Sequence, residues 1–308
     1  MMENRNEWII SLDSTSDEDR EINERLENSM MDTRLWNPGT ITTFLLAVVM
    51  LVLAVATGSA QETAISDIAD AAGRGLAIAV EADRRDAGFG DLTAEMVMVL
   101  RNRHGQESRR DIRLRTLEVD GDGDKSLSIF DRPRDVEGTA FLSFSHTTGN
   151  DDQWLYLPAL SRVKRISTSN KSGPFMGSEF SYEDISSQEV DEYTYTWIRD
   201  ETLDGVGMYV VERVPVDKNS GYTKLITWID REHFRTMKVE FYDRKGSLMK
   251  TLTPEGFHQY LEQFWRPDVM NMVNHQTGKS TVLDWTNYQF QTGLSDRDFD
   301  RNALKRAR

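Results

Sequence analysis

Side chains that could hold a metal ion or carry acid–base chemistry are scattered along this sequence. The five histidines lie far apart, and no H-x-H or H-E-x-x-H spacing brings two of them together. The stretch 120–124 (Asp-Gly-Asp-Gly-Asp) resembles the start of a calcium loop, but Lys125 stands where that loop needs glycine. Because the charge of a lysine opposes calcium binding, we expect a solvated turn there and predict no metal site.

Nucleophilic catalysis also lacks its usual residues. The chain has no cysteine, no G-x-S-x-G elbow and no S-x-x-K motif. The 51 acidic residues make chance carboxylate pairs common, so no single pair identifies a glycosidase. We therefore predict that the protein is not an enzyme and takes no cofactor. An envelope hydrolase acting on a polar substrate is the weaker alternative.

One cluster of charge is a candidate for binding. Arg162, Lys164 and Arg165 form the densest basic cluster of an acidic chain. Such a cluster is suited to contact with an anionic head group or an acidic partner. The alternative is a solvated strand face whose charges balance nearby acids.

Apolar side chains supply the other candidates for a binding site. A polar, glycine-containing stretch follows the basic cluster and carries Phe175 and Met176 in its middle, as lids and docking loops often do. The alternative is that this pair simply fills the core. Methionine adapts its shape to varied apolar ligands. The residues predicted to form an acyl-chain concavity and its lid are Met96, Met98, Leu100, Trp154, Tyr156, Phe175 and Met176.

The scaffold for these residues is predicted from the hydrophobic period. From 62 to 86, apolar residues recur three and four positions apart, which is typical of an amphipathic helix. From Leu92 onward the period changes to two, and turn residues such as Asp204-Gly205 separate short runs. A second, short helix is predicted at Pro254–Phe264. Strands are predicted at 92–100, 111–119, 125–131, 138–146, 153–158, 162–167, 193–199, 206–214, 222–230, 235–243, 247–253, 269–276 and 279–290.

A run of about a dozen strands with no helices between them predicts an antiparallel meander. A meander this long must close into a barrel, fold into a sandwich or curl around something. The net charge of −14 argues against a nucleic-acid partner. The lack of cysteine excludes disulfides, iron–sulfur clusters and lipid attachment through cysteine.

The first sixty residues have a different character. Residues 1–30 hold nine acids and three bases, which predicts a disordered extension or a start site placed too early. The apolar run Ile41–Ala56 is followed by Gly58-Ser59-Ala60, so we expect a signal peptide over 31–60 that is cut after Ala60. This predicts a periplasmic protein with one domain over 61–308. The alternative is an uncleaved anchor that holds this domain on the periplasmic side of the inner membrane.

Several strings give this domain a family resemblance. The chain resembles the outer-membrane lipoprotein-sorting proteins of the LolA/LolB-like superfamily. The segments that carry the resemblance are Asp152–Pro158, Arg162–Ile166, Ser169–Gly173, Phe175–Glu179, Tyr182–Asp184, Ser187–Glu189, Met208–Glu212, Phe241–Lys245 and Met272–Lys279.

The resemblance implies a mainly β (α+β) fold, an incompletely closed antiparallel barrel of about 11–12 strands curled around one or more helices. It also implies a monomeric, non-catalytic carrier that binds acyl chains of lipoproteins or lipids and works beside an inner-membrane exporter. A ligand-free adaptor of such an exporter or of an envelope complex is the alternative. Because no cysteine follows the signal, the chain resembles a soluble carrier and not a lipid-anchored receptor.

Overall fold

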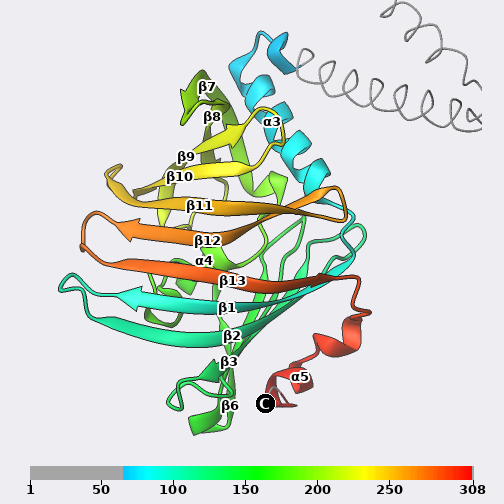
Figure 1. The fold of residues 1–308 in the computed structure, drawn as a ribbon, viewed down its shortest axis with the longest axis vertical. Helices are drawn as coiled ribbons and strands as arrows, with labels where there is room; N and C mark the ends of the chain where they lie inside the picture. Colours follow the sequence, from blue (N-terminus) through cyan, green and yellow to red (C-terminus); the bar gives the residue numbers. More distant parts are fainter. Residues whose placement is uncertain (1–64, 307–308) are drawn as a thin grey trace, which may run out of the picture. The chain divides into compact units, whose positions relative to one another are not determined.

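The computed structural model describes residues 65–306, and in them the fold is one continuous antiparallel sheet (Figure 1). Its strands lie in the order β6-β5-β4-β3-β2-β1-β13-β12-β11-β10-β9-β8-β7, so β6 and β7 are the two edges. The predicted extension at 1–30 and the predicted signal peptide at 31–60 lie outside the described residues. In the described part of the chain, no helix is long and apolar enough to cross a membrane.

Each strand pairs with the next strand in sequence, except that β6 does not pair with β7. The strands are β1 (Asp91–Arg101), β2 (Glu107–Leu117), β3 (Lys125–Arg132), β4 (Ala140–Phe144), β5 (Asp152–Leu157), β6 (Arg162–Ile166), β7 (Tyr193–Leu203), β8 (Val206–Pro215), β9 (Tyr222–Asp230), β10 (Thr236–Asp243), β11 (Leu248–Tyr260), β12 (Phe264–Asn274) and β13 (Ser280–Phe290). At the centre, β1 pairs with β13, which joins the meander β1–β6 to the meander β7–β13. The predicted incompletely closed antiparallel sheet is confirmed, with 13 strands in place of about 11–12.

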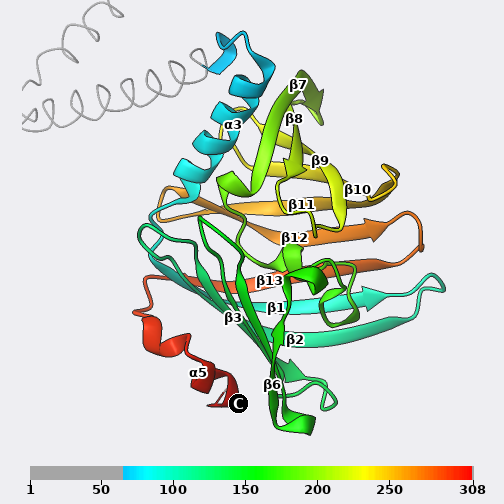
Figure 2. The same cartoon turned by 180° about the vertical axis from the view of Figure 1, so that it is seen from behind.

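The chain must cross from one edge of the sheet to the other between β6 and β7. It does so through residues 167–192, which we call the strap, and Figure 2 shows this segment on the inner side of the curved sheet. The strap contains one helical turn, α4 (Tyr182–Ile185), and three short 3-10 segments, at Thr168–Asn170, Phe175–Gly177 and Val190–Glu192. The sheet is therefore curled around a piece of its own chain.

Helix α3 (Ala71–Asp86) packs on the inner face near β7. Its first turn is capped by Asp70, whose carboxylate accepts a hydrogen bond of 2.7 Å from the Gly73 amide. At Gly75 the helix approaches β7 so closely that a Cβ atom there would lie 2.7 Å from the backbone nitrogen of Trp197. A side chain at this position would push the helix off the sheet.

The apolar residues spaced three and four apart in this helix include Leu76 and Val80, and the prediction that these two face the core is wrong. Leu76 and Val80 are 46% and 47% exposed, whereas Gly75 and Ile78 are buried. The close contact of Gly75 with β7 sets which face of the helix turns inward. A hydrophobic pattern counts only apolar side chains, so it ignores Gly75. The pattern therefore predicted that a neighbouring face of the helix points toward the sheet.

The helix predicted at Pro254–Phe264 is also wrong. Residues up to Tyr260 belong to β11, and Tyr260 pairs with Phe264 across the turn to β12. Leu261 and Glu262 have φ angles of 49° and 58°, as a tight hairpin of this hand requires. Apolar residues spaced three and four apart here lie on two strands of a hairpin.

The core has separate layers on the two faces of the sheet. On the inner face, the strap inserts Phe175 and Phe180 into a cluster that includes Met98, Phe130 and Phe141. On the outer face, the C-terminal helix α5 (Arg301–Arg306) and the preceding Phe299 cover β3–β5. The strand side chains in this layer are Leu127, Ile129, Ala140, Leu142 and Trp154. This alternation follows from the period of two along each strand.

Candidate functional site

A large cavity, of about 940 Å³, lies on the inner face of the sheet beside the strap and under α3. Its apolar floor comes from β10–β13 and includes Val239, Phe241, Leu252 and Met270. Phe180 of the strap closes one side. These side chains are mostly buried and lie at alternating positions of their strands, which is why one face of the sheet is continuously apolar.

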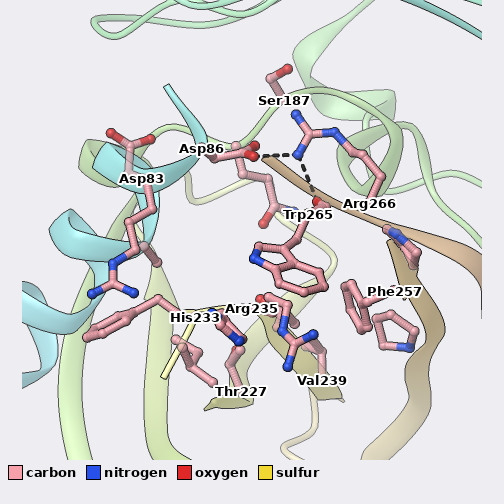
Figure 3. Close-up of a pocket in the computed structure, with 18 of the residues that line it drawn as sticks. Asp83, Asp86, Ser187, Thr227, His233, Arg235, Val239, Phe257, Trp265 and Arg266 are labelled. Carbon is pink, nitrogen blue, oxygen red and sulfur yellow. Dashed lines mark hydrogen bonds and ion pairs between the residues drawn. The ribbon is translucent and has the colours of Figure 1, made fainter. Parts of the chain in front are cut away.

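Aromatic and basic side chains gather at another wall of the cavity (Figure 3). The guanidinium of Arg235 donates to Asp230 at 2.7 Å and lies 4.5 Å from the ring centre of Trp265. The His233 ring lies 4.7 Å from the same indole. Arg266 forms an ion pair with Asp86 of α3, which connects this wall to the helix. Each of these two arginines is therefore compensated by a carboxylate.

Acidic side chains line the side of the cavity between α3 and the strap. Burial and the neighbouring carboxylate of Glu189 raise the pKa of Asp124 to about 7. Burial and the charges of nearby acids, Asp83 first among them, also raise the pKa of Glu189. The pKa of Asp83 is raised mainly by its own burial. These carboxyl groups therefore gain protons more readily than exposed ones do.

The strap is held in the concavity by buried polar contacts. The ammonium of Lys250 on β11 lies 2.6 Å from the Asp184 carboxylate and donates to the Glu179 carbonyl at 2.9 Å. Asp184 also accepts a hydrogen bond of 2.9 Å from the Tyr222 hydroxyl. A second ion pair, of 2.9 Å, joins Lys171 of the strap to Asp151. Since all these charges are removed from water, each depends on its partner.

Of the residues predicted from the sequence, those in β1 and the strap come together in the inner core. Met96, Met98 and Phe175 are buried in one cluster, and Leu100 and Met176 pack against it. This cluster borders the cavity through Phe180 and the floor residues Val239, Phe241 and Leu252, but none of the seven predicted ligand residues lines the cavity itself. They lie at the strap end of the concavity.

The other predicted residues lie around the β6 edge. Trp154 and Tyr156 face outward, in the layer that α5 covers. Arg162, Lys164 and Arg165 are exposed on the edge strand, and Arg165 is paired with Asp152. Arg165 and Trp154 also line a second pocket, of about 520 Å³, with Arg301 and Lys305 of α5.

Sequence reasoning missed most of the cavity walls, including Arg213, Thr227 and Trp285. Each is an isolated polar or aromatic residue in an ordinary strand pattern, and no local motif marks it. The alternation of β8 did offer a signal, because Tyr209, Val211 and Arg213 share a face. In the described residues, no group of three metal-ligating side chains is present.

Proteins of known structure share this open antiparallel fold. A LolA superfamily protein from Nitrosomonas europaea has this fold, with a TM-score of 0.60 at 23% identity over 73% of this chain and 97% of its own. No curated protein matches the chain. A family model described as an uncharacterized protein matches residues 122–306.

Two further crystal structures are similar in sequence as well. A candidate outer membrane lipoprotein-sorting protein domain from Vibrio parahaemolyticus is 58% identical, with a TM-score of 0.75 over 76% of this chain and 99% of its own. A DUF1329 family protein from Desulfovibrio piger is 35% identical, with a TM-score of 0.73 over the same shares. The chain belongs to the outer-membrane lipoprotein-sorting protein family of the LolA/LolB-like superfamily, as its sequence predicted.

Proposed function

We propose that this protein is a non-catalytic periplasmic carrier that holds acyl chains of lipoproteins or lipids for transport toward the outer membrane. The observation that supports the proposal is the cavity of about 940 Å³ with its apolar floor on the inner face of the sheet. Sites for small ligands commonly measure about 300–1,000 Å³ and are mostly apolar. Each CH₂ group that leaves water contributes about 0.8 kcal/mol, so an acyl chain needs such a surface during transport.

In this proposal the strap is the gate of the carrier. Phe175 and Met176 occupy the end of the concavity next to Met96 and Met98. Movement of the strap would join this end to the cavity and lengthen the apolar surface. The acyl groove would then include the residues that the sequence indicated. The loading partner would be an inner-membrane exporter, and the carrier would act as a monomer.

The edge strand β6 is proposed as a contact for head groups or for an acidic partner. Arg162, Lys164 and Arg165 are exposed there, and Leu160, in the preceding turn, is exposed too. Positive charge beside an exposed apolar side chain favours contact with anionic surfaces. The signal peptide that would deliver the chain to the periplasm remains a prediction from the sequence.

Native mass spectrometry of the protein from envelope fractions tests the carrier proposal. We expect bound acyl species, and we expect Leu252→Trp to remove them, because Leu252 lines the cavity. Thr253→Trp is the matched control, since Thr253 is the next residue of β11 and is not among the lining residues. Circular dichroism checks that both variants fold.

A protein without acyl species that takes up no added lipid would contradict the carrier proposal. That result would favour the ligand-free adaptor. One observation supports this alternative, because the strap already fills part of the concavity with the buried rings of Phe175 and Phe180. The search would then turn to protein partners.

A further inference from the structure

Three of the residues that line the cavity each carry a buried polar atom that has no hydrogen-bond partner within the described part of the chain. These atoms are Nε of Arg213, Oγ1 of Thr227 and Nε1 of Trp285. All three can donate a hydrogen bond. A buried donor without a partner destabilises the fold, so groups of this kind are usually satisfied. Three donors around one cavity therefore favour a ligand that brings acceptor oxygens.

Arg213 differs from the other arginines of the cavity wall in its charge balance. Arg235 and Arg266 have carboxylate partners, and Arg84 and Arg85 both pair with Glu81. In residues 65–306, the side-chain contacts of Arg213 are the Gln188 amide oxygen at 3.2 Å and the face of the Tyr193 ring at 4.8 Å. Its positive charge has no ion-pair partner there.

The sheet register places Arg213 and Thr227 together on the inner face. Val211 pairs with Thr227, and Arg213 pairs with Leu225 on the same two strands. Arg213 and Thr227 are thus diagonal neighbours, about 7–8 Å apart, with side chains on the same face. Figure 3 shows Thr227 beside Val239, where the apolar floor begins. A polar end and an apolar floor therefore adjoin in one cavity.

We propose that the cargo is an anionic amphiphile whose carboxylate or phosphate accepts hydrogen bonds from Arg213 and Thr227. Its acyl chain then lies along Val239, Phe241 and Leu252. This inference rests on the proposed carrier function, because it names the ligand class of the same cavity. It assigns to Arg213 and Thr227 a binding role for which the sequence has no motif.

Acids on the cavity wall oppose an anionic ligand, but the structure limits their effect. Asp184 is paired with Lys250. The pKa of Asp124 is raised to about 7 and that of Glu189 is raised as well, mainly by burial. Asp124 therefore loses its negative charge as the pH falls through about 7. Affinity for an anionic cargo should rise over the same range, as long as the cargo stays ionised.

Binding of three probes with the same sixteen-carbon chain tests the inference on the full-length protein. The probes are palmitate, palmitoyl lysophosphatidic acid and hexadecanol. Each is measured by the change in tryptophan fluorescence, below the micelle concentration of the two anions and below the solubility limit of the alcohol. We expect at least one anionic probe to bind about tenfold to a hundredfold more tightly than the alcohol, the range for hydrogen bonds to charged groups. Which anion binds more tightly distinguishes a carboxylate cargo from a phosphate cargo.

Variants then locate the preference. Arg213→Gln should remove most of the anion preference and leave hexadecanol binding unchanged, and Arg213→Lys should retain part of it. Thr227→Val, which keeps the shape of the side chain, should weaken anion binding several-fold and serves if Arg213→Gln does not fold. Lys224→Gln is the matched control, because Lys224 pairs with Glu212 and is not among the cavity-lining residues.

The possible failures are distinguishable. Equal affinity of the wild-type protein for the anions and the alcohol overturns the inference and leaves the carrier proposal standing. Equal weakening of all three probes by Arg213→Gln also overturns it, because that is the result of a purely structural role. Failure of every probe to bind overturns the carrier proposal itself.

Discussion

Removing Lys250 should release the strap, because this side chain holds a buried carboxylate. In the pair of Lys250 with Asp184, the two side chains are 1% and 4% exposed. Lys250→Met keeps most of the volume of the side chain and removes its charge and its three donors. The Asp184 carboxylate then stays buried without its ion-pair partner, and the Glu179 carbonyl loses its donor.

The expected cost follows from that burial. Removing one partner of a buried ion pair lowers the free energy of unfolding by about 3–5 kcal/mol. With a urea dependence of about 3 kcal/mol per molar, the unfolding midpoint falls by about 1–2 M. Lys238→Met is the control, because Lys238 pairs with Glu240 in a more exposed setting, and such pairs contribute about 0–1 kcal/mol.

A second substitution tests the reason for the cost. Asp184→Asn in the Lys250→Met background removes the unpaired charge but keeps an oxygen for the Tyr222 hydroxyl. The double variant should therefore be more stable than Lys250→Met alone by at least about 1 kcal/mol. Hydrogen exchange should also speed up across 171–185 in the single variant. A loss below about 1 kcal/mol for Lys250→Met, or a double variant less stable than the single one, would refute this account of the strap.

Three further predictions concern the core, the acidic wall and the β6 edge. Phe175→Ala should lower the free energy of unfolding by about 3–5 kcal/mol in urea denaturation and increase uptake of an acyl probe; unchanged uptake would argue against the strap as a gate. Because the pKa of Asp124 is raised to about 7 in the folded state, its contribution to stability is lost as the pH rises from about 4 to about 7. Asp124→Asn should therefore match the wild type near pH 4 and exceed it at pH 8 by on the order of 2–4 kcal/mol, and equal stability at both pH values would contradict the assigned shift. Replacing Arg162, Lys164 and Arg165 together by Gln should weaken sedimentation with anionic vesicles or pull-down of an acidic partner, with stability changed by less than about 1 kcal/mol; unchanged binding would favour a merely solvated strand face.

The strands could be predicted from the sequence because their signal is local. Alternation and turn residues mark each strand, and tight turns such as Asp204-Gly205 fix where neighbours begin. Pairing of β1 with β13 could not be predicted this way, because it joins residues almost 200 positions apart. The spacing of apolar residues also led to a wrong prediction around Phe257. A hairpin there places aromatic residues at the spacing of a helix.

The candidate site was harder to predict than the strands, because it too depends on contacts between residues far apart in the sequence. Phe175 could be singled out, because an apolar residue in a polar loop is unusual. Arg213 and Thr227 acquire their meaning only from the register of β8 with β9 and from the strap above them. A shift by one residue would turn both away from the cavity, and composition carries no information on that choice.

The unpaired edges of the sheet have a mechanical consequence. A closed barrel has its radius fixed by the number and stagger of its strands. Here β6 and β7 do not pair, so the wall can flex to a wider or narrower curve without breaking any ladder hydrogen bond. The strap is the tether between those two edges, and its length limits how far they separate. In the proposed carrier, the capacity for cargo is then a property of this tether. Lengthening the tether by a few residues should enlarge the cargo that such a carrier accommodates, without any change to its strands.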